Sequence, residues 1–109
     1  MDTYKIFTYG SLKRGHNNHE YLKGSKFLGE WETGPGYTKI SKGLPYLLVD
    51  SNGLGCSGEA YEVSELTLKL LDRLEGHPDW YQRTLIKIYR PEKDLVMNAY
   101  TYLMPKERI

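Results

Sequence analysis

The 109-residue chain contains a single cysteine, Cys56, so an internal disulfide is excluded and a reducing compartment is the expected setting. It lacks an excess of either charge, since fifteen Lys and Arg stand against fourteen Asp and Glu, for a net charge of +1. That balance gives no electrostatic reason to expect binding to nucleic acid or to an anionic membrane.

Long apolar runs are also missing, and none approaches the ~20 residues that a membrane-spanning helix needs. No basic stretch followed by an apolar run precedes the first strand-like segment, so no secretory signal is visible. With its modest length, the sequence therefore predicts a cytoplasmic protein with one compact domain over residues 1–109.

Segments rich in β-forming residues recur along the chain, separated by turns that contain glycine or proline. We expect about six strands, drawn from residues 5–9, 27–33, 37–40, 58–63, 83–90 and 95–103, with 45–49 as a further strand or extended run. A short helix, capped by Asn17 or Asn18, is expected to end near Gly24. Strands that outnumber helices without alternating with them predict an α+β domain with a mixed or antiparallel, barrel-like sheet.

The clearest helix covers Glu65–Glu75. Ser64 precedes it as an N-cap, and Gly76 follows as a left-handed stop. An apolar stripe at helical spacing is formed by Leu68, Leu71 and Leu74, with Leu70. This pattern predicts one main helix packed on the sheet, with the shorter helix flanking it.

Glu75 extends that stripe, because Leu71 and Leu68 lie four and seven positions before it on the same helical face. The negative end of the helix dipole and partial burial both disfavour a carboxylate there, so they raise its pKa. Such a group can both take and return a proton near neutral pH. The simpler interpretation is a glutamate at a frayed helix end that reaches solvent.

The loop that follows the first strand contains Tyr9, Gly10, Ser11 and Leu12. A glycine there permits a sharp turn and the close approach of a ligand. Consecutive backbone N–H groups in such a turn can bind a carboxylate or a developing oxyanion. The alternative is an ordinary turn at the end of a strand.

Cysteine and histidine chemistry is not favoured. Cys56 with His77 or His19 is a conceivable thiol–imidazole pair, but a lone cysteine in a glycine-rich stretch is usually inert. The histidines His16, His19 and His77 form neither a helical pair nor a cluster with cysteines, so no metal site is expected.

Two basic features have structural explanations. Lys13 and Arg14 are expected to form a solvated corner, and Arg83 is expected to pair with Asp72 or Asp79.

Several segments together resemble the gamma-glutamylcyclotransferase-like family. The resemblance is carried by FTYGSLKRG at residues 7–15, GEAY at 58–61, LDRLEG at 71–76, WYQRT at 80–84 and YTYL at 100–103. It spans nearly the whole chain in order, and the Asn18-His19 pair with YQRT looks closest to the gamma-glutamylaminecyclotransferase group. Ser11 stands where that group usually has threonine, and the chain ends soon after the last strand, so the choice of substrate stays open.

The resemblance implies a small mixed barrel with flanking helices. It implies an enzyme that cyclises the γ-glutamyl group of a γ-glutamylamine or γ-glutamyl peptide to 5-oxoproline and releases the amine, without metal or organic cofactor. Glu75 is then the general acid and base. The glutamyl portion is bound by the backbone of Tyr9, Gly10, Ser11 and Leu12, with Tyr81 and Tyr102 as pocket walls. The expected partner is a small γ-glutamyl molecule, with neither nucleic acid nor membrane, and the oligomeric state is left open.

Two other functions fit parts of the sequence. One is a non-catalytic module that binds a carboxylate-bearing small molecule on the same fold. The other is a small barrel that stacks nucleic-acid bases on its ten tyrosines. Glutamates interspersed among the strand aromatics, at positions 30, 32, 59 and 62, count against the second.

Overall fold

The computed structural model describes residues 2–10, 13, 15–16, 19–41, 45–105 and 107. The elements, in chain order, are β1 (Thr3–Thr8), the 3-10 helix η1 (His19–Leu22), β2 (Lys26–Glu32), β3 (Tyr37–Ile40), β4 (Tyr46–Val49), β5 (Ser57–Ser64), α1 (Glu65–Glu75), β6 (Gln82–Arg90), the 3-10 turn η2 (Pro91–Lys93) and β7 (Leu95–Leu103). None of the helices in these ranges has the length and apolar character needed to cross a membrane. The expected caps of the short helix, Asn17 and Asn18, lie outside the described residues.

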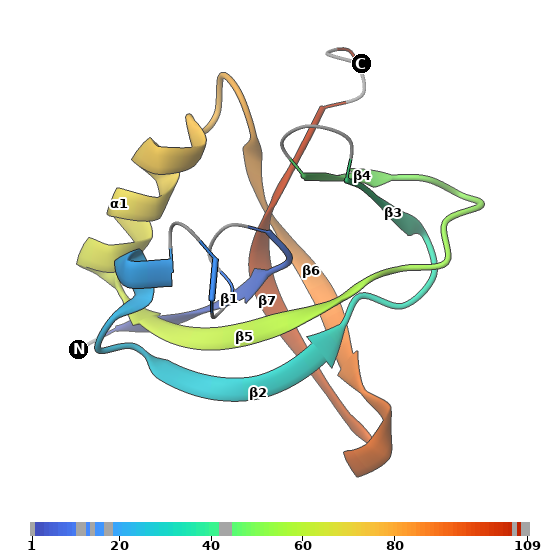
Figure 1. The fold of residues 1–109 in the computed structure, drawn as a ribbon, viewed down its shortest axis with the longest axis horizontal. Helices are drawn as coiled ribbons and strands as arrows, with labels where there is room; N and C mark the ends of the chain where they lie inside the picture. Colours follow the sequence, from blue (N-terminus) through green and yellow to red (C-terminus); the bar gives the residue numbers. More distant parts are fainter. Residues whose placement is uncertain are drawn as a thin grey trace.

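One sheet contains seven strands in the order β1-β5-β2-β6-β7-β4-β3. A parallel pairing of β1 with β7, through Ile6 and Tyr100, closes the first five of these strands into a barrel. The other pairings around the ring are antiparallel, so the barrel is mixed, as predicted. The β3–β4 hairpin joins β7 beside the barrel, and Figure 1 shows it on the side opposite α1. The described residues form seven strands where about six were expected, because residues 46–49 pair with β3 on one side and with β7 on the other.

The helix α1 begins and ends where its local sequence predicts. The Ser64 hydroxyl accepts a hydrogen bond from the backbone N–H of Thr67 at 3.1 Å. At the other end, Gly76 adopts the left-handed conformation with φ 69°, which a residue with a Cβ rarely takes. Leu68 and Leu71 are buried as expected, but Leu70 is 41% exposed. The inclusion of Leu70 in the inward stripe was wrong, because its position lies about 100° around the helix from Leu71.

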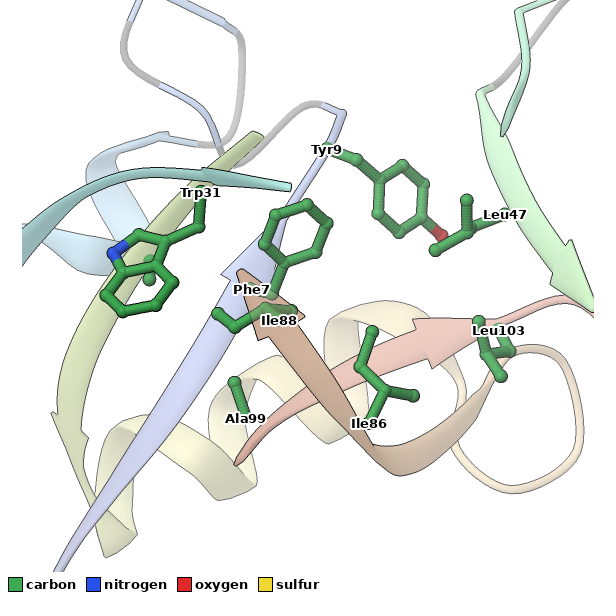
Figure 2. Packing of buried hydrophobic residues seen from close by; sticks show 9 residues of the cluster. Phe7, Tyr9, Trp31, Leu47, Ile86, Ile88, Ala99 and Leu103 are labelled. Atoms are coloured by element: carbon green, nitrogen blue, oxygen red, sulfur yellow. The ribbon is translucent and has the colours of Figure 1, made fainter. Parts of the chain in front are cut away.

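Two hydrophobic clusters form the core. Successive side chains of a strand point to opposite faces, so the neighbours Ile6 and Phe7 enter different clusters. The cluster with Ile6 lies between the barrel wall and α1, which packs on β1, β5 and η1. The cluster with Phe7 fills the barrel, as Figure 2 shows for Phe7, Tyr9, Trp31, Leu47, Ile86, Ile88, Ala99 and Leu103.

The C-terminal end of α1 meets three strand ends. The backbone N–H of Tyr81, just before β6, donates to the carbonyl of Glu75 at 3.1 Å. In the β6–β7 hairpin, Gln82 pairs with Leu103, so the start of β6 and the end of β7 lie together. Tyr9, after the end of β1, donates its hydroxyl hydrogen bond to the backbone of Tyr102 in β7. The end of the helix is therefore fixed against the ends of β1 and β7 and the start of β6.

Candidate active site

Glu75 is the last residue of α1, and it lies on the helical face that carries the buried Leu68 and Leu71. Its side chain is half-buried. Desolvation by this burial raises the pKa of the Glu75 carboxyl to about 7. The prediction of a raised pKa is thus supported, and burial is its cause. The alternative of a side chain extended into bulk solvent does not fit this placement.

Three buried tyrosines lie near this carboxyl. They are Tyr9, Tyr81 and Tyr102, whose exposed fractions are 8%, 7% and 3%. Burial raises the pKa of all three phenols. The negative charge of Glu75 contributes to the raised pKa in each case. Since such an effect weakens with distance, the structure brings together four of the seven residues that the sequence singled out.

The hydroxyl hydrogens of these tyrosines are all donated to protein acceptors. Tyr9 donates to the backbone carbonyl of Tyr102. Tyr81 donates to the carbonyl of Pro45 at 3.1 Å, and Tyr102 donates to Asp72 Oδ1 at 2.7 Å. A phenol has one hydrogen to donate. These hydrogen bonds hold the three rings in place, and their hydroxyls are not free donors for a bound molecule. The role of Tyr81 and Tyr102 as pocket walls, which the resemblance implies, stays a prediction.

Gly10 follows Tyr9, and its carbonyl accepts a hydrogen bond from the backbone N–H of Lys13 at 3.0 Å. Among the described residues, the nearest atoms to a Cβ built on Gly10 belong to Pro45, at 3.7 and 3.9 Å, which is ordinary contact. Protein atoms in the described ranges thus leave room for a methyl group there. The other two predicted loop residues, Ser11 and Leu12, lie outside the described residues, so their proposed amide contacts stay a prediction.

Asp72 belongs to the site although the sequence named it only as a partner of Arg83. That ion pair is present, with Arg83 Nη1 2.8 Å from Asp72 Oδ2. The hydrogen bond between Asp72 and Tyr102 could not be predicted from the local sequence, because thirty positions separate the two residues. Its one available hint was that Asp72 lies three positions before Glu75, which places both carboxylates on neighbouring parts of the helix surface.

Two further candidates from the sequence, His77 and Cys56, have structural explanations. His77 accepts the backbone N–H of Arg83 on Nδ1 at 2.9 Å. Burial raises the pKa of the Cys56 thiol, which disfavours a reactive thiolate. Within the ranges that the structure describes, no three His, Cys, Asp or Glu side chains are grouped so as to hold a metal ion.

A separate cavity of about 270 Å³ lies where β2, β5 and the β6–β7 turn meet. Its described lining includes four glutamates but not Glu75: Lys13, Glu30, Trp31, Glu32, Ser57, Gly58, Glu59, Tyr89, Pro91 and Glu92. Clustered carboxylates repel phosphate groups, so this hollow does not resemble a nucleic-acid groove.

Comparison with known proteins gives matches that cover both the barrel and the end of α1. A family model described as "Gamma-glutamyl cyclotransferase, AIG2-like" matches residues 6–109. A protein of Methanocaldococcus jannaschii, provisionally named a gamma-glutamylcyclotransferase, is 41% identical over 102 residues, which cover 93% of this chain and 84% of that protein.

Gamma-glutamylaminecyclotransferase C of Danio rerio is 39% identical over 97 residues, which cover 81% of this chain but only 64% of that protein. The crystal structure of an AIG2-like protein from Mus musculus has the same fold, with a TM-score of 0.84 at 30% identity. That match covers 95% of this chain and 78% of the mouse chain. The relatives thus extend beyond the part that this chain matches.

Proposed function

The chain belongs to the gamma-glutamyl cyclotransferase, AIG2-like family and is an enzyme of that type, and we propose that it closes the γ-glutamyl group of a γ-glutamylamine or γ-glutamyl peptide into 5-oxoproline and releases the amine. The substrate is a small γ-glutamyl molecule. Resemblance to gamma-glutamylaminecyclotransferases makes γ-glutamyl-ε-lysine the first substrate to test.

The observation that carries the proposal is the place of the Glu75 carboxyl, half-buried at the end of α1 near the buried Tyr9, Tyr81 and Tyr102, where burial raises its pKa to about 7. A general acid and base works best when its pKa lies near the working pH, because both protonation states are then available. An exposed glutamate, with a pKa near 4.3, is a poor proton donor at neutral pH. Glu75 is thus suited to take a proton early in the reaction and return it later.

The reaction begins with Glu75 as carboxylate, which takes a proton from the α-ammonium group of the substrate. The freed amine attacks the γ-carbonyl carbon, a carbon–nitrogen bond forms, and the carbonyl oxygen becomes an oxyanion. Collapse of this intermediate breaks the bond to the leaving nitrogen, to which Glu75 returns its proton. Once it has returned the first proton, Glu75 is again a carboxylate, so it takes the second proton from the ring nitrogen and passes it to the released amine. The amine leaves as an ammonium ion, and atoms and charge balance without metal or cofactor.

Ring closure is intramolecular, so the protein's main task is to hold the γ-glutamyl chain folded. In our proposal the backbone N–H groups of Gly10, Ser11 and Leu12 bind the α-carboxylate and the oxyanion. The rings of Tyr81 and Tyr102 then limit the space on the other side. The room above Gly10 supports this role, because it allows a ligand atom to approach the backbone closely.

The test is a panel of γ-glutamyl-ε-lysine, γ-glutamyl-alanine and glutathione, with detection of 5-oxoproline. Glu75→Gln keeps the size of the side chain but cannot accept the proton, so turnover should fall by at least about 100-fold. Glu65→Gln is the matched control, because Glu65 lies on the same helix in an exposed pair with Lys69. Near-normal release by Glu75→Gln would disprove the mechanism, and binding without release by the wild-type chain would favour a binding module.

Gly10→Ala tests the loop separately. Since ordinary contact with Pro45 is all that a Cβ meets among the described residues, the free energy of unfolding should stay the same or rise by about 0.4–1 kcal/mol. The methyl group should nevertheless obstruct the substrate, and KM should rise with little loss of stability. An unchanged KM would show that the substrate does not approach Gly10.

A further inference from the structure

Asp72 joins three elements next to Glu75. Its Oδ1 accepts a hydrogen bond from the Tyr102 hydroxyl of β7 at 2.7 Å, and its Oδ2 accepts one from Arg83 Nη1 of β6 at 2.8 Å. The side chains of Asp72 and Arg83 are only 20% and 26% exposed. An ion pair that is exposed on the surface contributes little to stability. The pair of Asp72 and Arg83 is more shielded from water than that.

Hydrogen bonds from β6 and from the residue just before it also hold Glu75 and the loop that follows it. The backbone N–H of Arg83 donates to His77 Nδ1 at 2.9 Å. The carbonyl of Glu75 itself accepts the backbone N–H of Tyr81 at 3.1 Å. Arg83 therefore contacts the chain on both sides of Glu75, with its side chain at Asp72 and its backbone at His77.

We propose that Asp72 is a positioning residue for the reaction: by tying the last turn of α1 to Tyr102 and Arg83, it fixes the direction in which the Glu75 carboxyl points. This inference rests on the proposed role of Glu75. Residues three apart on a helix have Cβ atoms about 5–6 Å apart, so Asp72 lies beside Glu75. Both of its oxygens accept charge-assisted or phenolic hydrogen bonds, which suits a fixed support and not a proton carrier.

In the intact protein burial raises the pKa of Glu75, and removal of either half of the Asp72–Arg83 pair should add an uncompensated charge beside it. Among the described residues, the phenols of Tyr9, Tyr81 and Tyr102 are the groups whose pKa the charge of Glu75 raises. The neighbouring ions, Asp72 and Arg83, neutralise each other. Loss of one half therefore leaves a single charge near Glu75, and its sign depends on which half is removed.

Asp72→Asn leaves the Arg83 cation unpaired, which favours ionised Glu75 and should move its titration to lower pH. Arg83→Met keeps the aliphatic stem and leaves the Asp72 anion unpaired, which should move the titration to higher pH. Each shift should be on the order of 0.5–1 pH unit at this separation. Both variants should lower kcat by about 10- to 100-fold, because a misplacement of the reacting group by about 1 Å has an effect of that size.

The experiment measures 5-oxoproline release from γ-glutamyl-ε-lysine across pH 5.5–9 for the two variants. Asp79→Asn is the control, because it makes the same substitution at an exposed position in the loop after α1, and it should leave kcat and the pH profile unchanged. NMR titration of the Glu75 carboxyl carbon, assigned through Glu75→Gln, reports the same shifts without catalysis. Far-UV circular dichroism establishes that each variant is folded.

Opposite shifts of the two variants support the proposal, together with a kcat loss that exceeds any change in KM. A folded Asp72→Asn with normal kcat and unchanged Glu75 titration would overturn it, as would equal shifts in one direction. If Asp72→Asn does not fold, Arg83→Met decides alone, since it leaves the hydrogen bond between Tyr102 and Asp72 in place. A wild-type chain that releases no 5-oxoproline would reject the proposed function, while the NMR titration would still test the support of Glu75 by Asp72.

Discussion

Replacing Glu75 with glutamine should remove activity and, above neutral pH, make the protein more stable. The pKa of the carboxyl rises from an ordinary 4.5 to about 7 in the folded chain, because burial disfavours the charged form. Between these values the folded state binds more protons than the unfolded state. The free energy of unfolding of the wild type must therefore fall as pH rises from about 4.5 through about 7.

The size of this fall follows from the shift. A difference of about 2.5 pH units corresponds to about 3 kcal/mol at 1.36 kcal/mol per unit, which is an upper bound because the side chain is only half-buried. Glutamine does not titrate, so the variant lacks this pH dependence. The stability difference between the variant and the wild type should increase steadily over the same range and level off above about pH 8.

Urea unfolding at pH 5, 6, 7 and 8 measures this difference directly. The value at one pH also contains the effect of placing an amide in the site, so the change with pH is the quantity to compare. Glu65→Gln, on the exposed face of α1, should show almost no change with pH. A flat difference for Glu75→Gln, or an equal rise for Glu65→Gln, would refute the claim that the fold holds Glu75 in a desolvated place.

Three further results are expected. The value of kcat/KM should rise with pH through about 7, as Glu75 ionises, and a profile with its acid limb near pH 4 would contradict this. Ser64→Ala removes the acceptor of the Thr67 N–H and should cost about 1 kcal/mol in urea unfolding, with kcat unchanged. Gly58→Ala places a Cβ in collision with the Thr8 carbonyl oxygen and should cost about 2–3 kcal/mol by overpacking; wild-type stability would show that β1 and β5 separate easily.

The sequence predicted α1 residue for residue because every signal for it is local. The Ser64 cap, the buried positions Leu68 and Leu71, and the stop at Gly76 all lie within thirteen consecutive residues. Nearest-neighbour chemistry decides such an element. The same locality explains why the raised pKa of Glu75 could be anticipated from its helical face.

A barrel was expected, but the strand pair that closes it could not be predicted in the same way. It depends on the parallel pairing of β1 with β7 at Ile6 and Tyr100, almost the whole chain apart. The buried Thr101 hydroxyl adds a bond to the carbonyl of Phe7 at 2.9 Å. Alternating side chains tell which residues face inward, but they do not tell which strand lies next to which. For the same reason, the sequence does not predict which groups accept the hydroxyl hydrogen bonds of Tyr102 and Tyr81.

The proton chemistry proposed for Glu75 and the stability of the fold depend on the same side chains. Burial, and not a neighbouring carboxylate, is the leading cause of the raised pKa, so the value of about 7 lasts only while water is kept away. Tyr81 and Tyr102 belong to the core cluster beneath α1, and Tyr9 belongs to the barrel interior. Truncation of any of these rings would therefore loosen the core and hydrate Glu75 together, whereas a phenylalanine keeps the ring and removes only the hydroxyl. Comparing the two substitutions at Tyr81 separates the contribution of packing from that of its hydrogen bond to Pro45.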